Sequence, residues 1–218
     1  MRDAGDPDSS EGAEPRKSPR SRRGTRTRAS LLEAARSVFE RDGYLASRVT
    51  DIADEAGVAH GTFYTYFDSK EEVFAAVLHE LQEEMLHAGV HVGGAGEDPL
   101  QAIEAANRAY LESYRRNTRL MAALDEASAV NERVRAIRLE RVAAFTERNA
   151  HGIRRLQQNG LVDPALDADV ASLAVSGMVS RVADLVFVQG VQVDFETLVW
   201  SLTRLWANAL RLAAGTEN

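Results

Sequence analysis

The chain has 218 residues, of which 44% are hydrophobic, and a formal net charge of −7. It contains no cysteine, which excludes disulfides, thiolate nucleophiles and cysteine-based metal sites and fits a reducing cytoplasm. No apolar run approaches the roughly 20 residues that span a bilayer, and the polar start is unlike a signal peptide, so we expect a cytoplasmic protein with room for one small and one larger domain.

The charge is distributed unevenly. Residues 15 to 50 hold ten lysines and arginines against three acidic residues, a net charge of +7, so the remainder carries −14. A basic end on an acidic body favours one-sided docking on a polyanion. Residues 1 to 24 are rich in Pro, Gly, Ser and charge, which predicts disorder. The basic part, 15 to 28, is either an arm that follows DNA or a solvated tail.

The next part of the chain predicts three helices. Apolar residues at helical spacing indicate a helix from Arg26 to Arg41, ended at Gly43. A second, short helix runs from Val49 to Ala56, and Gly57 stops it. A third begins at about His60. Two short helices joined by a glycine turn make a helix-turn-helix unit, which is either a plain structural corner or an element that reads DNA.

This unit closely resembles the TetR family of bacterial repressors in the segment GVAHGTFYTYFDSKEEVF, residues 57 to 74. Members of that family read roughly G-V-S-x-G-T-F/L-Y-x-Y-F-x-S-K-E-x-L. The chain departs at Ala59, where the family usually has Ser, and at Arg48, where a Thr or Ser commonly caps the first helix of the motif. Ser47 is therefore the expected cap. The resemblance is specific over residues 28 to 81 and weak beyond.

The resemblance implies an N-terminal three-helix head with the helix-turn-helix and a C-terminal helical domain for ligand binding and dimerisation. The corresponding divisions are a tail at residues 1–24, a DNA-binding domain at 25–70 and a regulatory domain at 71–218. The residues themselves predict no convincing strand and no internal repeat. We therefore expect an all-α protein.

A recognition helix contacts the DNA bases through exposed residues near its start. A glycine there lets the backbone approach the DNA, and the lysine at the next helix start adds a charge for phosphate, as the matching lysine does in the family. Phe63 and Phe67 are expected in the core. The candidate DNA-binding residues are Arg48, Thr50, His60, Gly61, Thr62, Tyr64, Tyr66 and Lys70.

Beyond the head, apolar periodicity and capping residues predict helices as far as residue 212. The first of them has contacts at both ends, so we interpret it as the connector between head and body. A loop is expected at 89 to 96, and Asp98, Asp167 and Asp194 are expected to cap helices. The expected helices cover residues 70 to 87, 98 to 114, 120 to 124, 131 to 159, 168 to 188 and 195 to 212.

A ligand cavity is predicted between the helices of the region from Met85 to Met178. Methionine and aromatic side chains suit adaptable apolar pockets, although each is also compatible with an ordinary core. Arg181 and Asp184, three residues apart, are interpreted as an intrahelical ion pair rather than as a polar ligand contact. The candidate ligand-binding residues are Met85, Tyr110, Tyr114, Met121, Leu124, Phe145 and Met178.

The last two helices are apolar on more than one side, which indicates packing on both the body and a second subunit. The resemblance implies a four-helix dimer interface, with two helices from each subunit. The candidate interface residues are Val175, Val182, Leu185, Leu202 and Trp206.

Metal binding and catalysis have little support in the sequence. His87 and His91 have the spacing of two ligands on one helix, but the glycines that follow end the helix there. No catalytic triad order, phosphate loop or dinucleotide fingerprint occurs. We therefore expect no cofactor and no enzymatic activity.

The sequence thus predicts a ligand-responsive DNA-binding transcriptional regulator. The preferred form is a homodimeric repressor that a small apolar or amphipathic molecule releases from an inverted-repeat operator. The alternatives are an architectural DNA-binding protein with a filled body, and a helical small-molecule binding module whose head is vestigial.

Overall fold

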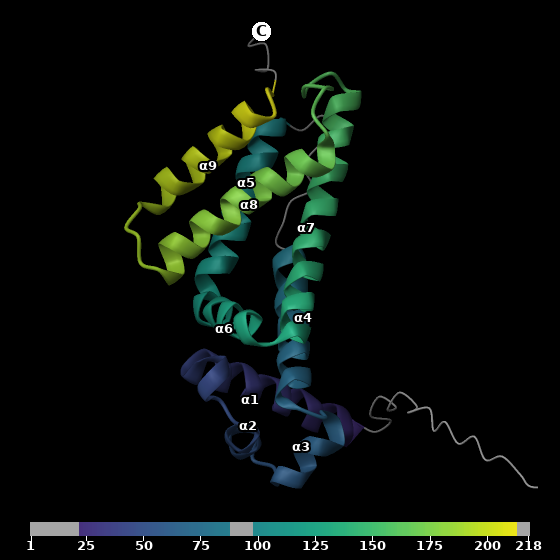
Figure 1. Ribbon diagram of the computed structural model, residues 1–218, viewed down its shortest axis with the longest axis vertical. Helices are drawn as coiled ribbons and strands as arrows, with labels where there is room; N and C mark the ends of the chain where they lie inside the picture. Colours follow the sequence, from purple (N-terminus) through teal and green to yellow (C-terminus); the bar gives the residue numbers. More distant parts are fainter. Residues whose placement is uncertain (1–21, 88–97, 213–218) are drawn as a thin grey trace, which may run out of the picture.

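The computed structural model describes residues 22 to 87 and 98 to 212, and all regular structure in those ranges is helical. A head formed by α1 to α3 lies at one end of an elongated body formed by α4 to α9 (Figure 1). The elements are α1 (Arg22–Ala46), α2 (Val49–Glu55), α3 (His60–Tyr66), α4 (Lys70–His87), α5 (Pro99–Arg116), α6 (Thr118–Val130), α7 (Glu132–Gln158), α8 (Ala168–Ala183), the π-helical η1 (Asp184–Val188) and α9 (Phe195–Ala209).

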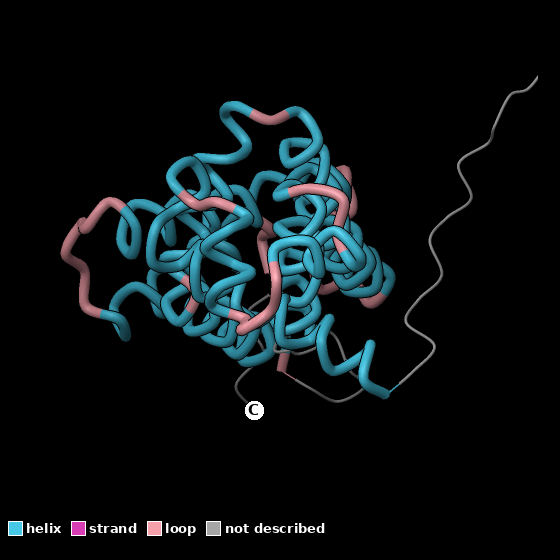
Figure 2. Tube along the Cα trace, turned by 90° about the horizontal axis from the view of Figure 1, so that it is seen from below, coloured by secondary structure: helices cyan, strands magenta, loops and turns pink. Residues whose placement is uncertain are grey.

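Seen from the head end, the described residues consist of helices joined by loops, with no strand among them (Figure 2). The all-α expectation is confirmed. In the body, α4 runs from the head along α7, and α8 packs on α7 (Figure 1). Helix α9 packs on α5.

Capping side chains start several helices where the sequence predicts. Asp98, Asp167 and Asp194 each accept a backbone N–H from the first turn of α5, α8 and α9 respectively. Gly57 (φ 67°) and Gly160 (φ 71°) adopt the left-handed conformation just after α2 and α7, which a side chain would disfavour. These local signals explain why the boundaries could be predicted.

The start of α1 differs from expectation. The helix begins at Arg22, so residues 22 to 24 are helical rather than part of a disordered tail, and the rest of that tail lies outside the described residues. The expected loop at 89 to 96 also lies outside them. At its other end α1 bends at Gly43 (φ 76°, ψ 177°) and continues for one more turn to Ala46.

The start of α2 also differs, because Ser47 does not cap it. The Ser47 hydroxyl donates to the Tyr44 carbonyl at 2.8 Å. Arg48 occupies the cap position instead, and its N–H donates to the Asp51 carboxylate at 3.1 Å. The acidic side chain three residues into the helix therefore satisfies the backbone where the usual Thr or Ser is missing.

One apolar core extends from the head into the body. Phe39 and Phe74 meet edge to face with ring centroids 4.6 Å apart, and Tyr44 tilts against Phe74 at 4.9 Å. Further along α4, Leu78 and Leu81 are fully buried against the body. Because α4 contributes to both parts of this core, its expected role as connector agrees with its packing.

A second connection between head and body was not predicted. Helix α6 packs along α1, and its Glu126 carboxylate accepts the N–H groups of Tyr44 at 2.7 Å and Leu45 at 3.3 Å. The bend at Gly43 exposes these two N–H groups, and a Cβ at Gly43 would lie 2.9 Å from Glu126 Oε2. The backbone conformation therefore favours glycine, and a side chain at this position would also push the Glu126 carboxylate away.

The segment Ala168–Val188, which combines α8 and η1, is long and apolar enough to cross a bilayer by length and composition, with a mean hydropathy of 1.5. The expectation that no segment reaches this length was therefore wrong. Only 28% of its most apolar window is buried within the monomer. One such helix is weak support for a membrane span, since core helices meet the same criterion.

We predict that Glu126→Ala destabilises the protein by about 1–3 kcal/mol, because two N–H groups at the head–body joint lose a charged acceptor. Thermal unfolding should show a lower Tm. The control is Glu140→Ala, which removes the same charge from an exposed position on α7 and should leave the Tm unchanged. Equal Tm values for the two variants would show that the Glu126 contact contributes nothing.

Candidate functional site

The helix-turn-helix unit holds one side of α3 in the head core and leaves the other open. Phe63 and Phe67 anchor α3, with exposed fractions of 0% and 1%. The turn before it is fixed by Gly57 and by Val58, whose N–H donates to the Ala53 carbonyl at 3.0 Å. The apolar spacing of these residues thus sets which side of α3 faces outward.

The outer side of α3 carries the residues predicted to read DNA. His60, Gly61 and Tyr64 are exposed, and the His60 and Tyr64 rings meet edge to face at 5.2 Å. A Cβ added to Gly61 would meet no atom within 4 Å, so the surface there is open. Thr62 and Tyr66 are half-buried, and Arg48 and Thr50 are exposed at the start of α2. The structure therefore leaves most of the predicted contacts accessible.

Lys70, predicted to contact phosphate, is held by backbone groups of the head. Its ammonium donates to the carbonyls of Tyr44 at 2.8 Å and Ser47 at 3.0 Å, and it lies 4.4 Å from the centre of the Tyr44 ring. Burial lowers its pKa. Because these contacts use two of its three N–H groups, Lys70 fixes the joint between α1 and α2 and is a poor candidate for a main phosphate contact.

Additional basic residues flank α3. Arg22, Arg23 and Arg26 are exposed on the first turns of α1, and Arg28 stacks over the Phe67 ring at 5.1 Å. The turns of α1 that carry Arg23 and Arg26, together with the turn at Val58 before α3, line a shallow groove. The sequence predicted either an arm or a solvated tail for residues 15 to 28 and a helix only from Arg26, whereas α1 already begins at Arg22 and fixes the direction of these arginines.

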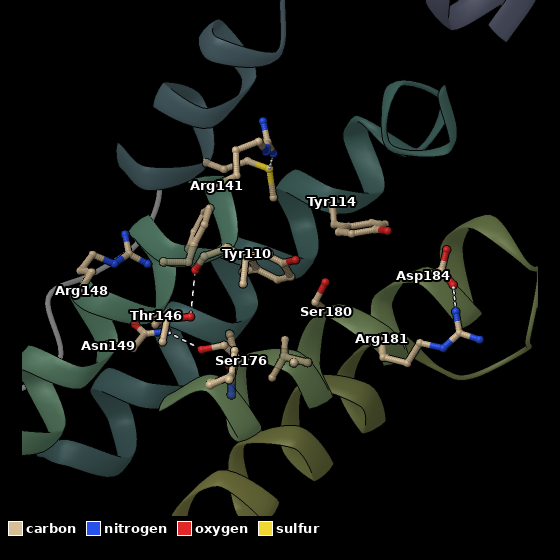
Figure 3. Close-up of a pocket in the computed structure, with 18 of the residues that line it drawn as sticks. Tyr110, Tyr114, Arg141, Thr146, Arg148, Asn149, Ser176, Ser180, Arg181 and Asp184 are labelled. Carbon is tan, nitrogen blue, oxygen red and sulfur yellow. Dashed lines mark hydrogen bonds and ion pairs between the residues drawn. The ribbon is translucent and has the colours of Figure 1, made fainter. Parts of the chain in front are cut away.

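The body contains a partly open cavity of about 330 Å³ lined by α5, α6, α7 and α8, with Met85 of α4 and Trp206 of α9 also on its wall. Figure 3 shows Tyr110 and Tyr114 beside it on α5. Six of the seven predicted residues line it, and Met178 does not. Met178 is half-buried and packs against the core instead. The six lining residues are Met85, Tyr110, Tyr114, Met121, Leu124 and Phe145.

The cavity is more polar than the sequence suggested. Four arginines and two aspartates line it, a net charge of +2 in a chain of net charge −7. The helical spacing of Arg138, Arg141, Phe145 and Arg148 places all four on one face of α7. That spacing was visible in the sequence. Of the other three charged residues, Arg181 and Asp184 were predicted to form an ion pair, and Asp125 carried no prediction.

Both aspartates on the wall are paired. Asp125 of α6 pairs with Arg138 of α7, and Asp184 pairs with Arg181, so the ion pair predicted for the latter two is present. Burial raises the pKa of Asp125. The first pair joins α6 to α7, whereas the second lies within α8 and the start of η1, as Figure 3 shows.

Three of the predicted dimer-interface residues lie inside the monomer. Val175, Leu202 and Trp206 are 5%, 2% and 5% exposed and belong to the core. Both helices are apolar on two sides, so periodicity could not tell which side faces inward. Val182 and Leu185 are half-buried. The apolar side chains left exposed are Val170 and Leu173 on α8 and Trp200 and Leu205 on α9.

Metal binding has no support in the described part of the chain. Its residues include no group of three His, Cys, Asp or Glu side chains placed to hold an ion. His91 lies outside the described residues, so the His87 and His91 pair is not tested.

Several known proteins resemble this chain. A family model described as bacterial regulatory proteins, tetR family, matches residues 31–77. The transcriptional regulator TcmR of Streptomyces glaucescens is 40% identical over 92 residues, which span 42% of this chain and 40% of that protein. The regulator TtgR of Pseudomonas putida is 26% identical over 168 residues, 71% of this chain and 79% of that protein.

Solved structures share the fold over most of the chain. SmeT, the repressor of the Stenotrophomonas maltophilia multidrug efflux pump SmeDEF, superposes with a TM-score of 0.71 at 18% identity, covering 86% of this chain and 91% of that one. The fatty acid degradation regulator FadR of Bacillus halodurans gives 0.69 at 20% identity, covering 85% and 97%. At these identities the likeness concerns the fold alone.

We predict that Lys70→Gln lowers the free energy of unfolding by about 1–3 kcal/mol, since two carbonyls lose a charged donor. Urea unfolding should show a lower midpoint with an unchanged slope. Arg119→Gln removes one positive charge from an exposed position on α6 and should leave the midpoint unaltered. A midpoint for Lys70→Gln equal to that of the control would show that Lys70 does not stabilise the joint.

Proposed function

The chain belongs to the TetR family of bacterial regulatory proteins, and on this premise we propose that it is a homodimeric repressor, released from DNA by a small molecule that enters the body cavity. It acts in the cytoplasm, on DNA, and it catalyses no reaction. The regulatory domain extends from residue 71 and the DNA-binding domain covers 25–70, with α1 starting slightly earlier.

One observation carries this proposal. Helix α6 places Met121, Leu124 and Asp125 on the cavity wall, and the next residue, Glu126, binds the backbone of α1 in the head. A ligand that displaces α6 therefore acts directly on the helix that supports α2 and α3. Helices α6 and α1 therefore connect the cavity to the head that carries α3.

DNA binding is supported by shape and charge. The exposed start of α3 fits the major groove, where base edges carry distinct donors and acceptors. Arg48, Arg22 and Arg23 are exposed on the head and can contact phosphates. We assign base contacts to His60, Gly61, Thr62 and Tyr64, and we assign to Lys70 a positioning role.

Dimerisation is supported by the apolar surface that α8 and α9 leave uncovered. Val170 and Leu173 are 65% and 53% exposed, and Trp200 and Leu205 are 63% and 51% exposed. Side chains of this size rarely gather on an open surface unless a partner covers them. The low burial of the apolar segment 168–188 has the same explanation. We therefore place the four-helix interface on these outward sides.

The cavity favours a ligand-responsive regulator over the alternatives. An architectural DNA-binding protein needs a filled body, whereas this body has a partly open cavity of about 330 Å³, within the range of small-molecule sites. A binding module with a vestigial head has no need for an open glycine on α3 or for the Glu126 contact. Selection from a random DNA pool, followed by footprinting, tests DNA binding, and an inverted repeat with half-sites about 34 to 36 Å apart is expected.

We predict that Gly61→Leu abolishes most of the affinity for the selected DNA while leaving the fold intact. The new side chain meets open space in the protein but occupies the position where DNA approaches. Fluorescence anisotropy should show a loss of about a hundredfold or more, and thermal unfolding no decrease in Tm. Ala129→Leu, at an exposed position on α6, should bind like the parent. Undiminished binding by Gly61→Leu would mean that α3 does not enter the groove.

We predict that Leu205→Asp yields a folded monomer, because the side chain is exposed in the monomer but covered in the proposed dimer. Light scattering should give about half the parent mass. Leu139→Asp, at a 63% exposed position on α7, should remain dimeric. Leu202→Asp should instead unfold, since Leu202 is 2% exposed in the core. A dimeric Leu205→Asp variant would place the interface elsewhere.

A further inference from the structure

Arg141 is an unusual wall residue, because it is buried but has no acidic partner among the described residues. It is 5% exposed, and its guanidinium donates to the Leu78 carbonyl at 2.7 Å and to the Met85 sulfur at 3.6 Å. Figure 3 shows it on the wall of the cavity, away from the Arg181–Asp184 pair. A buried charge is costly unless an opposite charge compensates it.

The neighbouring side chains do not supply that opposite charge. Burial raises the pKa values of Tyr110 and Tyr114, so both phenols are neutral at pH 7. Desolvation lowers the pKa of Arg141 to about 10, which still leaves it charged. Asp125 and Asp184 are each held by another arginine. Arg141 therefore keeps a positive charge that no described side chain neutralises.

Other wall residues also favour a ligand that carries a negative charge or a hydrogen-bond acceptor. The Trp206 indole N–H is buried without a hydrogen-bond partner, and an indole can only donate. Arg148 adds a further positive charge to the wall, with its guanidinium 5.2 Å from the centre of the Phe145 ring. Met121, Leu124 and other apolar side chains line much of the remaining wall. The cavity thus combines apolar side chains with positive charge and one buried N–H donor, that of Trp206, which has no acceptor.

We propose that the molecule bound in this cavity is an amphipathic anion, and that its acidic group, a carboxylate, sulfonate or phenolate, pairs with the guanidinium of Arg141. This inference rests on the proposed function of the cavity as a ligand site and specifies the class of ligand. A bidentate pair with an acidic group is the strongest contact that arginine offers. Because Arg141 also donates to the Leu78 carbonyl of α4, the acidic group is linked to the connector helix through this one side chain.

The test uses two fluorescent probes that differ by one acidic group. Anilinonaphthalene sulfonate is an anion, and N-phenylnaphthylamine has the same aromatic skeleton without the sulfonate. Each is titrated into the full-length protein and its variants. Ala106→Trp fills the cavity from α5, since Ala106 lies on its wall. The fluorescence that this variant removes is assigned to the cavity.

The parent protein should bind the sulfonate roughly tenfold or more tightly than the neutral probe. Arg141→Gln should reduce that preference to about twofold or less while binding the neutral probe like the parent, which also reports that it is folded. Arg133→Gln, an exposed arginine of α7 away from the cavity, should keep the full preference.

Two results would overturn the inference, and they differ in what they mean for the function. Equal affinity of the parent protein for both probes, or an undiminished preference in Arg141→Gln, would refute the anionic ligand and leave the cavity as a ligand site. The comparison of the two probes on the parent protein needs no variant. If neither probe gave fluorescence that Ala106→Trp removes, the cavity would not bind ligands, and the proposed function would fail with the inference.

Discussion

The contact between Glu126 and the bent end of α1 is the interaction on which the arrangement of this protein depends. One carboxylate oxygen accepts the N–H groups of Tyr44 and Leu45, and the Tyr44 carbonyl in turn accepts from Lys70 at the start of α4. Tyr44 is therefore held from the body by α6 and from the connector by α4. The bend at Gly43 exposes the N–H groups for this purpose, so the backbone conformation of one glycine determines how head and body meet.

Two routes lead from the cavity to the head, and both end at Tyr44. Helix α6 carries wall residues and Glu126, while α4 is bound at Leu78 by Arg141 and reaches Tyr44 through Lys70. A displacement of either helix changes the support of α1, and α1 carries the core of the head. In a dimer, a small rotation of each head changes the distance between two recognition helices that must enter successive major grooves. A coupling of about 1 to 3 kcal/mol is sufficient for a large change in affinity.

Local signals made much of the fold predictable from the sequence. Asp98, Asp167 and Asp194 start helices through side-chain bonds to their own first turns, and Gly57 and Gly160 end them, so no distant residue is involved. The long-range contacts were not predictable. Glu126 and Arg141 read as ordinary charged residues of surface helices, because their partners are backbone groups 63 to 82 residues away. Leu202 of α9 is buried and Leu205 of the same helix is exposed. Because the helix is apolar on more than one side, the periodicity of the sequence could not show which of the two faces the core.

Coupling between the cavity and the head is most directly measured by a double-mutant cycle on DNA affinity. Met121→Trp enlarges a wall residue of α6, Glu126→Ala removes the contact with α1, and the third variant carries both changes. The affinity for the DNA selected by the parent protein is measured for all four proteins, with thermal unfolding as the check of folding. We expect Met121→Trp to change the affinity at least about fivefold, and this effect to be mostly lost when Glu126 is alanine. An unchanged affinity of folded Met121→Trp, or the same effect in both backgrounds, would contradict a link from the cavity through α6.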